Sequence, residues 1–204
     1  MLTLSKFEAK TKEEALEKCL NELNLKQEEL FIKESETEAK LFKSKKYTIE
    51  VITKKEIIKY IKEYLREIDK SFDIELKSEV NENENIIKVN LVSNNNPILI
   101  GKDGKNIEAL QILIRNSIKN QIGIDIKVNI DASNYKKKKE ENFEREIKRI
   151  LKEVQKTHME TKLDPMNSYK RRIVHNLASK FNNIKTESEG VEPNRYTIIK
   201  YEED

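Results

Sequence analysis

The first fifty residues switch between strand-like and helix-like patterns of apolar side chains. Apolar and polar residues alternate with one slip from Leu2 to Ala9, which predicts a strand. The capping box Thr11–Glu14 then predicts the start of an amphipathic helix. Two short apolar segments, Leu30–Ile32 and Tyr47–Val51, predict two more strands. Residues 1–52 are therefore expected to form a small β-α-β-β domain.

The next eighty residues predict a second domain with a different order of elements. A second capping box, Thr53–Glu56, opens a helix whose apolar side chains recur every three to four positions. Two strands, a short apolar helical segment, a glycine-containing loop, a second amphipathic helix and a last strand follow. They are predicted at Phe72–Leu76, Ile86–Val92, Ile98–Ile100, Gly101–Gly104, around Ile107–Ile118, and at Ile124–Ile130. Residues 53–132 thus predict the order α-β-β-α-α-β.

The remaining residues, 133–204, predict a long basic helix followed by a third α/β domain. The long helix carries apolar residues every three to four positions through Val154, and a break follows at residues 164–167, where Asp164 and Asn167 are candidate caps. A shorter helix and two strands complete the pattern, at Tyr169–Phe181, Ile184–Thr186 and Arg195–Tyr201. The predicted fold class is α+β, with three small α/β domains in series.

The composition supports several small domains instead of one large core. The chain has 204 residues, of which 38% are charged and 36% apolar, and small domains bury proportionally less surface than large ones. The net charge of +3 says little about binding partners. Residues 136–185, however, hold 15 Lys/Arg against 7 Asp/Glu. Such a basic segment is typical of polyanion binding or, equally, of a solvated helical face.

The sequence also indicates the cellular compartment in which the protein is expected. The single cysteine, Cys19, lies on an apolar helical stripe and is interpreted as a small core residue. One thiol makes no intrachain disulfide, which favours a reducing compartment. No apolar run reaches the roughly 18–20 residues that span a bilayer, and the N-terminus lacks the features of a signal peptide. We therefore expect a cytoplasmic protein that is not an integral membrane protein.

The loop Gly101-Lys102-Asp103-Gly104 is the first candidate site. Glycines let a backbone approach a ligand closely, and the first N–H groups of the following helix favour anions. Lys102 and Lys105 can add charge-assisted hydrogen bonds to a phosphate, whereas Asp103 fits only if its carboxylate points to solvent. Two glycines at this spacing often form only a turn. Their position between two helices of an α-β-β-α-α-β domain favours a phosphate site.

Because of this glycine loop and the order of elements around it, the stretch from about 54 to 130 resembles a bacterial KH domain of the type II-like class. The resemblance implies that the Gly101–Gly104 loop clamps the backbone of about four unpaired nucleotides. Their bases are expected in an apolar groove of Ile98, Ile100, Ile107 and one face of strand 86–92. Packing in the core is the alternative for most of these aliphatic side chains.

The second candidate site is Arg171, Arg172 and His175. Arg171 and His175 are four residues apart and therefore share one face of a helix. Arginine can hold a phosphate with two parallel hydrogen bonds, and an imidazole can donate or stack. An ordinary surface pair is the alternative. With the flanking stretches 163–167 and 186–196, the segment resembles an R-3-H domain, a family that binds single-stranded nucleic acid.

The four lysines Lys136, Lys137, Lys138 and Lys139 open the helix between the two predicted nucleic-acid-binding domains. Basic residues at a helix N-terminus oppose the helix dipole, so their presence points to a use other than helix stability. We interpret them as a basic track for a polyanion, the alternative being solubility.

A KH domain followed by an R-3-H domain is similar to the Jag/EloR family of bacterial RNA-binding proteins, with residues 1–52 in the place of its Jag-N domain. The resemblance implies an RNA chaperone or post-transcriptional regulator in the cytoplasm, linked to cell elongation, cell shape and cell-wall synthesis. It also implies a small partner KH protein (KhpA-like). The basic turn Lys40–Lys46 lacks the glycine usual in that family's first domain.

Catalysis is not expected. His158 and His175 are the only histidines, no His/Cys/Asp cluster has metal-ligand spacing, and no phosphate-binding P-loop motif occurs. We expect no metal and no cofactor.

The alternative function is that of an adaptor, in which residues 1–52 dock a membrane-associated or cell-wall partner through the Lys40–Lys46 turn.

Overall fold

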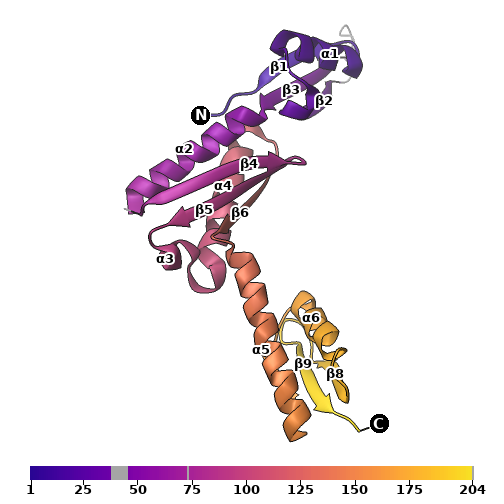
Figure 1. The fold of residues 1–204 in the computed structure, drawn as a ribbon. Coiled ribbons are helices and arrows are strands. Elements are labelled where there is room, and N and C mark those ends of the chain that lie inside the picture. Colours follow the sequence, from indigo (N-terminus) through magenta and orange to yellow (C-terminus); the bar gives the residue numbers. More distant parts are fainter. Residues whose placement is uncertain (38–45, 73, 204) are drawn as a thin grey trace. The chain divides into compact units, whose positions relative to one another are not determined.

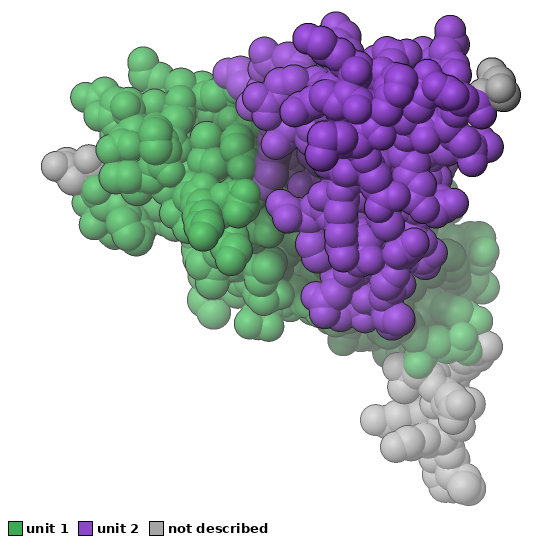
Figure 2. Space-filling view, turned by 90° about the horizontal axis from the view of Figure 1, so that it is seen from below, with its two compact units in different colours: residues 1–135 green, residues 136–204 purple. Residues whose placement is uncertain are grey.

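The computed structural model describes residues 1–37, 46–72 and 74–203. Its contacts divide the chain into two compact units, Met1–Tyr135 and Lys136–Asp204, which are coloured in Figure 2. Each unit combines helices with one or two small sheets (Figure 1), so the predicted α+β class is confirmed. The predicted three-domain division, 1–52, 53–132 and 133–204, stays a prediction.

The first unit begins with the β-α-β-β order predicted for residues 1–52. Strands β1 (Ser5–Ala9), β2 (Leu30–Thr37) and β3 (Lys46–Thr53) form an antiparallel sheet in the order β1-β3-β2, and helix α1 (Lys12–Leu23) packs against it; a 3₁₀ turn, η1 (Gln27–Glu29), precedes β2. The Thr11 side chain accepts the Glu14 N–H at 3.2 Å, as expected for the N-cap.

Cys19 is buried in this core, and burial raises its thiol pKa, so the core interpretation is confirmed. Residues 40–45 of the predicted basic turn lie outside the described residues.

The α-β-β-α-α-β order of the next segment is also confirmed. It comprises α2 (Lys54–Phe72), β4 (Leu76–Asn83), β5 (Ile86–Ser93), α3 (Asn96–Ile100), the 3₁₀ turn η2 (Lys102–Gly104), α4 (Lys105–Ile122) and β6 (Lys127–Ala132). The second capping box is reciprocal, because Thr53 Oγ1 accepts the Glu56 N–H while the Glu56 carboxylate accepts the Thr53 N–H. The predicted strand at 72–76 begins only at Leu76, because α2 extends through Phe72, whose side chain is 68% exposed.

The sheet of this segment has the order β4-β5-β6, and its pairings fix the path of the chain. Strands β4 and β5 are antiparallel, whereas β5 and β6 are parallel. A parallel pair needs a crossover connection, which α3, the glycine loop and α4 supply. Helices α2 and α4 cover one face of the sheet (Figure 1), where Ile61, Ile87, Ile114 and Ile130 are fully buried.

Three residues of the N-terminal segment belong to the same hydrophobic cluster as α2, α4 and β4–β6. They are Leu2, Phe31 and Ile52. The Leu2 N–H also donates to Gln121 Oε1 of α4 at 2.8 Å. Residues 1–135 are therefore held together by a shared apolar core as well as by chain connectivity.

The second unit packs two helices on a three-stranded antiparallel sheet. Helix α5 (Tyr135–Thr157) and helix α6 (Ser168–Ala178) bury apolar side chains against β7 (Thr161–Lys162), β8 (Ile184–Glu189) and β9 (Tyr196–Tyr201), in the sheet order β7-β9-β8. Asn167 caps α6 by accepting the Lys170 N–H at 3.0 Å. Strand β8 runs three residues beyond the predicted Ile184–Thr186, and the two-residue strand β7 was not predicted.

Two isoleucines of α4 provide a matched test of the core. Ile114 is fully buried, whereas Ile112 is 56% exposed on the same helix. Ile114→Ala is expected to lower the free energy of unfolding by about 2–5 kcal/mol, because it removes buried apolar surface and leaves a cavity. Ile112→Ala is expected to change it by at most about 0.5 kcal/mol. Urea unfolding followed by circular dichroism measures both, and similar losses from the two substitutions would contradict the described packing.

Candidate nucleic-acid interface

The Gly101–Gly104 loop has a backbone that only glycine accommodates well at both ends. Gly101 and Gly104 have φ angles of 70° and 85°, and Asp103 between them is also left-handed at 57°. A Cβ on Gly101 would lie 2.4 Å from Asn106 Cγ, and a Cβ on Gly104 would lie 2.7 Å from Tyr135 Cε1. Side chains from both flanks therefore pack directly on the loop backbone.

The loop is fixed at both ends by hydrogen bonds. The Gly101 N–H donates to the Pro97 carbonyl at 2.9 Å, and Asn106 Nδ2 donates to the Ile98 carbonyl at 2.8 Å. Lys102, Asp103 and Lys105 are exposed, and α4 begins directly after Gly104. The loop thus combines the N-terminus of an 18-residue helix with two exposed ammonium groups, which favours an anion.

The predicted apolar groove is mostly core. Ile107 is 2% exposed, and the inward face of β5 is buried, so the core interpretation holds for these side chains. Ile98 is 54% exposed and Ile100 is half-buried beside the loop. Of the isoleucines predicted for the groove, Ile98 and Ile100 are therefore the ones that offer apolar surface.

Arg171 and His175 share one face of α6, as predicted, but they are embedded in the second unit. Arg171 is only 7% exposed; its Nη1 donates to the Met166 carbonyl at 2.7 Å and lies 2.8 Å from Glu192 Oε1. The interpretation as an ordinary surface pair is therefore wrong. Arg172, one position further along the helix, is exposed.

The His175 ring joins α6 to β8 through both nitrogens. Nδ1 lies 2.6 Å from Thr186 Oγ1, and Nε2 lies 2.9 Å from Ser188 Oγ. Burial, and secondarily the nearby charge of Arg171, lower the pKa of His175 below its ordinary value. A neutral imidazole has one donor and one acceptor, and hydroxyl groups can complement either tautomer. His175 thus acts as a neutral link between the helix and the sheet.

Two charged residues at this site were not singled out from the sequence. Glu192 pairs with Arg171, and Arg195 Nη2 donates to the Ser188 carbonyl at 3.4 Å. Both lie in the stretch 186–196 that carries the R-3-H resemblance. The chain pattern cannot indicate that this stretch folds back onto α6, because its contacts with α6 span 11 to 21 positions.

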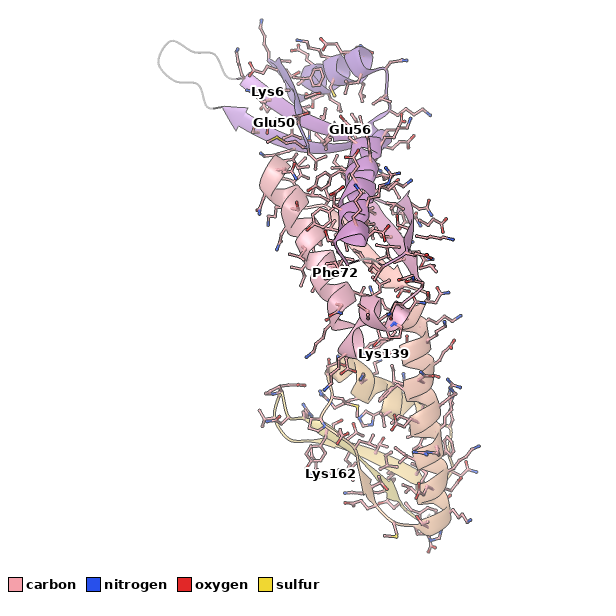
Figure 3. All side chains as sticks on the ribbon, turned by 90° about the vertical axis from the view of Figure 1, so that its left-hand side faces the viewer. Lys6, Glu50, Glu56, Phe72, Lys139 and Lys162 are labelled. Atoms are coloured by element: carbon pink, nitrogen blue, oxygen red, sulfur yellow. The ribbon has the colours of Figure 1, made fainter. Side chains whose placement is uncertain are left out.

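The lysine run Lys136–Lys139 occupies the start of α5, and Lys139 is labelled near that end of the helix in Figure 3. The first turn of α5 contains no acidic residue, and Lys137 is 3.9 Å from Glu141. Lys136, Lys137 and Lys138 are exposed, as a basic track requires.

Metal and membrane binding were also considered in the described parts of the chain. Within residues 1–37, 46–72 and 74–203, no group of three or more His, Cys, Asp or Glu side chains could hold a metal ion. Among the described helices, none combines the length and apolar character needed to span a bilayer.

Comparison with known protein families identifies the two domains that carry the candidate sites. Residues 55–130 match the family model described as the KH domain of KhpA/KhpB, and residues 141–201 match the R-3-H domain. The chain is therefore of the class in which a KH domain precedes an R-3-H domain.

The relatives extend over nearly the full chain. It is 32% identical over 196 residues to the RNA-binding protein KhpB of Clostridium symbiosum, covering 94% of this chain and 88% of that protein. It is 28% identical over 195 residues to KhpB of Bacillus subtilis (93% and 94% covered) and 28% identical over 136 residues to KhpB of Streptococcus pneumoniae (67% and 42% covered). This chain belongs to the KhpB family.

The close contact at Gly104 can be tested against a second left-handed glycine. Gly104→Ala is expected to destabilise the first unit by the cost of a left-handed alanine, about 1–2 kcal/mol, plus a clash with the Tyr135 ring. Gly123→Ala has the same backbone cost, but its Cβ meets only the flexible end of Lys33 at 3.1 Å. Urea unfolding should therefore rank Gly104→Ala as the more damaging. The opposite order would contradict the described packing of Tyr135.

The lowered His175 pKa predicts a pH dependence of stability. The unfolded chain takes up a proton near the ordinary histidine pKa of about 6.5, whereas the folded chain does so only at lower pH. The unfolded state therefore binds more protons in this window, and the free energy of unfolding should fall as the pH falls below about 6.5. His175→Asn should flatten this part of the profile, measured by urea unfolding between about pH 5 and 8. An unchanged profile in the variant would show that other groups cause the loss.

Proposed function

We propose that this protein binds single-stranded RNA, with the Gly101–Gly104 loop of the KH domain as the main backbone clamp. The observation that carries this proposal is the geometry of the loop: an exposed, cationic turn at the N-terminus of α4, between two helices of a KH-domain frame. The names of the relatives as RNA-binding proteins support it.

In this proposal the loop holds the sugar-phosphate backbone. The N–H groups at the start of α4 face a phosphate, and Lys102 and Lys105 add charge-assisted hydrogen bonds. The proposal requires that the carboxylate of the exposed Asp103 point away from the phosphate. Ile98 and Ile100 contact the bases, and such a limited apolar surface gives little base selectivity.

The R-3-H domain supplies a second grip through Arg171, Arg172 and His175. The exposed Arg172 reaches a phosphate directly, whereas Arg171 and His175 act from positions embedded between α6 and β8. The lysines Lys136–Lys139 form a basic track that attracts the same strand without sequence preference.

The cellular role that we propose is that of a cytoplasmic RNA chaperone or post-transcriptional regulator with no catalytic activity. Its links to cell elongation, cell shape and cell-wall synthesis rest on the family resemblance. A small partner KH protein (KhpA-like) is proposed to bind the KH domain. The neighbouring apolar side chains Ile112 and Leu113 on α4, both more than half exposed, support a protein contact there.

The second candidate function is an adaptor that docks a membrane-associated or cell-wall partner through residues 1–52. It rests on the four lysines of the segment Lys40–Lys46, most of which lie outside the described residues. The two functions are separable in cells. If a chain that has lost RNA binding still restores normal cell shape to a deletion strain, the adaptor function is favoured.

Two lysines of the loop test the RNA-binding proposal. Lys102→Asp with Lys105→Asp should weaken the binding of a labelled single-stranded RNA sharply, because two phosphate contacts become repulsive. Each lost contact should also lower the slope of log K against log salt by roughly 0.7. Fluorescence anisotropy at several salt concentrations measures both quantities.

The matched control changes two exposed lysines of α2, Lys55→Asp and Lys62→Asp, which alter the net charge equally away from the loop. It should weaken binding much less. Equal effects of the two double variants, or unaltered binding by the loop variant at moderate salt, would exclude the loop as the clamp.

A further inference from the structure

The chain that leads from β6 into α5 contacts both ends of the segment formed by α3 and the glycine loop. This junction comprises residues Ser133, Asn134 and Tyr135. At the start of the segment, Asn96 Nδ2 of α3 donates to Ser133 Oγ at 3.2 Å. At its end, the Tyr135 ring packs on Gly104, directly before α4 begins. The junction therefore holds the loop-bearing segment from two sides.

The junction is itself fixed to the sheet of the KH domain. The Ser133 N–H donates to the Leu91 carbonyl of β5 at 3.1 Å, and Ala132, the residue before it, is fully buried. Tyr135 is half-buried and packs against the same hydrophobic cluster as the sheet and α4. The core of the first unit thus sets the position of the junction, and the junction contacts fix the loop relative to that core.

The loop and the junction both contain side chains at positive φ. Asp103 has a φ angle of 57°, and Ser133 and Asn134 have φ angles of 49° and 59°. Such angles are uncommon outside glycine, and they persist where surrounding contacts determine the backbone. They also cluster in ligand-binding loops. The contacts of the junction therefore lie where the backbone needs support beyond its local preferences.

The contact between Tyr135 and Gly104 is made by ring carbons. A Cβ on Gly104 would lie 2.7 Å from Tyr135 Cε1 and 3.5 Å from both Cδ1 and Cζ. Gly104 is the N-cap residue of α4 and has no side chain with which to cap that helix. The first N–H groups of α4 follow directly, and these are the groups that favour a phosphate. The ring therefore supports the backbone at the point that sets the direction of those N–H groups.

We propose that Tyr135 is a positioning residue for RNA binding, which acts through Gly104 and, together with Ser133, keeps the loop in its phosphate-binding conformation in the absence of RNA. A loop that is already ordered loses less conformational entropy when it binds. If the loop were competent in only about a tenth of the molecules, RNA would bind about 10-fold more weakly. This inference rests on the proposed function, in which the loop is the backbone clamp, and it assigns part of the affinity to residues outside the loop.

The test compares two tyrosines that pack against the same hydrophobic cluster, in the full-length protein. Tyr135→Leu removes the ring beside Gly104. Tyr64→Leu makes the same change on α2, where the ring lies 6.2 Å from that of Tyr60. The ligand is a labelled oligouridylate of about 12 nucleotides, three times the roughly four that a KH loop clamps.

Tyr135→Leu should bind this oligouridylate about 10-fold more weakly than the wild-type protein, and Tyr64→Leu should stay within about 2-fold of it. Tyr135→Phe, which keeps the ring carbons that contact Gly104, should bind like the wild-type protein. Equal binding by Tyr135→Leu and Tyr64→Leu would overturn the inference.

The salt dependence distinguishes positioning from the loss of a charge contact. The slope of log K against log salt reports the cations that neutralise phosphates in the complex. Tyr135→Leu removes no cation and changes only the population of the competent loop, so its slope should equal that of the wild-type protein. Lys102→Asp with Lys105→Asp should lower the slope. A slope lowered as much by Tyr135→Leu would show that the bound complex itself has lost contacts, which contradicts a positioning role.

The state of the loop is read directly from backbone N–H NMR signals. Without RNA, the Gly104 and Lys105 signals should be displaced or broadened in Tyr135→Leu but unchanged in Tyr64→Leu. Unchanged loop signals in Tyr135→Leu would contradict the inference. Urea unfolding shows whether each variant is folded under the conditions of the binding measurement.

Ser133→Ala covers the case in which Tyr135→Leu fails to fold. It removes the hydroxyl that accepts the Asn96 hydrogen bond, and it should weaken oligouridylate binding about 3-fold, within the range of one hydrogen bond. Ser179→Ala is the matched control, because that hydroxyl donates to the Asn176 carbonyl in the second unit. Equal binding by the two serine variants would count against the junction.

The outcomes separate the two proposals. If the wild-type protein binds oligouridylate and the loop-lysine variant does not, but Tyr135→Leu and Ser133→Ala bind like their controls, only the inference fails. If the wild-type protein binds no oligouridylate at low salt, the proposed function fails and takes the inference with it.

Discussion

The parallel pairing of β5 with β6 is the constraint on which the candidate RNA clamp depends. Two parallel neighbours cannot be joined by a hairpin, so the chain must cross over the sheet between Ser93 and Lys127. The crossover is helical, and its two helices meet at the Gly101–Gly104 loop. Burial of Ile114 and Ile118 on α4 anchors the crossover to the sheet. The loop thereby lies at the junction of two helices, directly before the N-terminus of α4.

The two candidate nucleic-acid sites differ in where their charged side chains lie. In the KH domain the charges are exposed and the backbone is held by packing, with Asn106 and Tyr135 against the two glycines. In the R-3-H domain the Arg171 charge is buried while Arg172 is exposed, and Arg171 and His175 are hydrogen-bonded to the loop and strand that follow. An exposed lysine contact is strongly screened by salt, whereas a buried guanidinium is screened much less. If both candidate sites bind RNA as proposed, binding through the KH loop should therefore depend more strongly on salt than binding through Arg171.

The order of elements could be predicted from the sequence because periodicity and capping are local properties. The Thr11 N-cap, the capping box Thr53–Glu56, the glycine loop and the Asn167 cap are formed as expected, whereas the Glu14 carboxylate accepts the Lys10 N–H in place of the Thr11 N–H. The misplaced strand at Phe72–Leu76 had a local cause as well: the helical and strand patterns overlap there, and the helix continues through Phe72. The sheet order and the parallel pairing carry no such local signal.

The candidate site was predictable only in part, for the same reason. The exposed lysines of the loop follow from the pattern of α4, but the burial of Arg171 and its partners depends on where residues 186–196 return in space. Sequence spacing pairs Arg171 with His175; only the fold adds Glu192 and Arg195 to them. The fold also shows that Ile107 is not part of the predicted groove, because its side chain is buried in the core.

The central claim is that one RNA strand is held by the KH loop and the R-3-H cluster. The most direct test is ultraviolet crosslinking of the full-length protein to single-stranded RNA, with mass spectrometry to locate the crosslinked peptides. The account predicts crosslinks in the peptides that contain residues 98–105 and in those that contain residues 171–175 or 189–196. Crosslinks confined to residues 1–52, or spread evenly over the surface lysines, would contradict it.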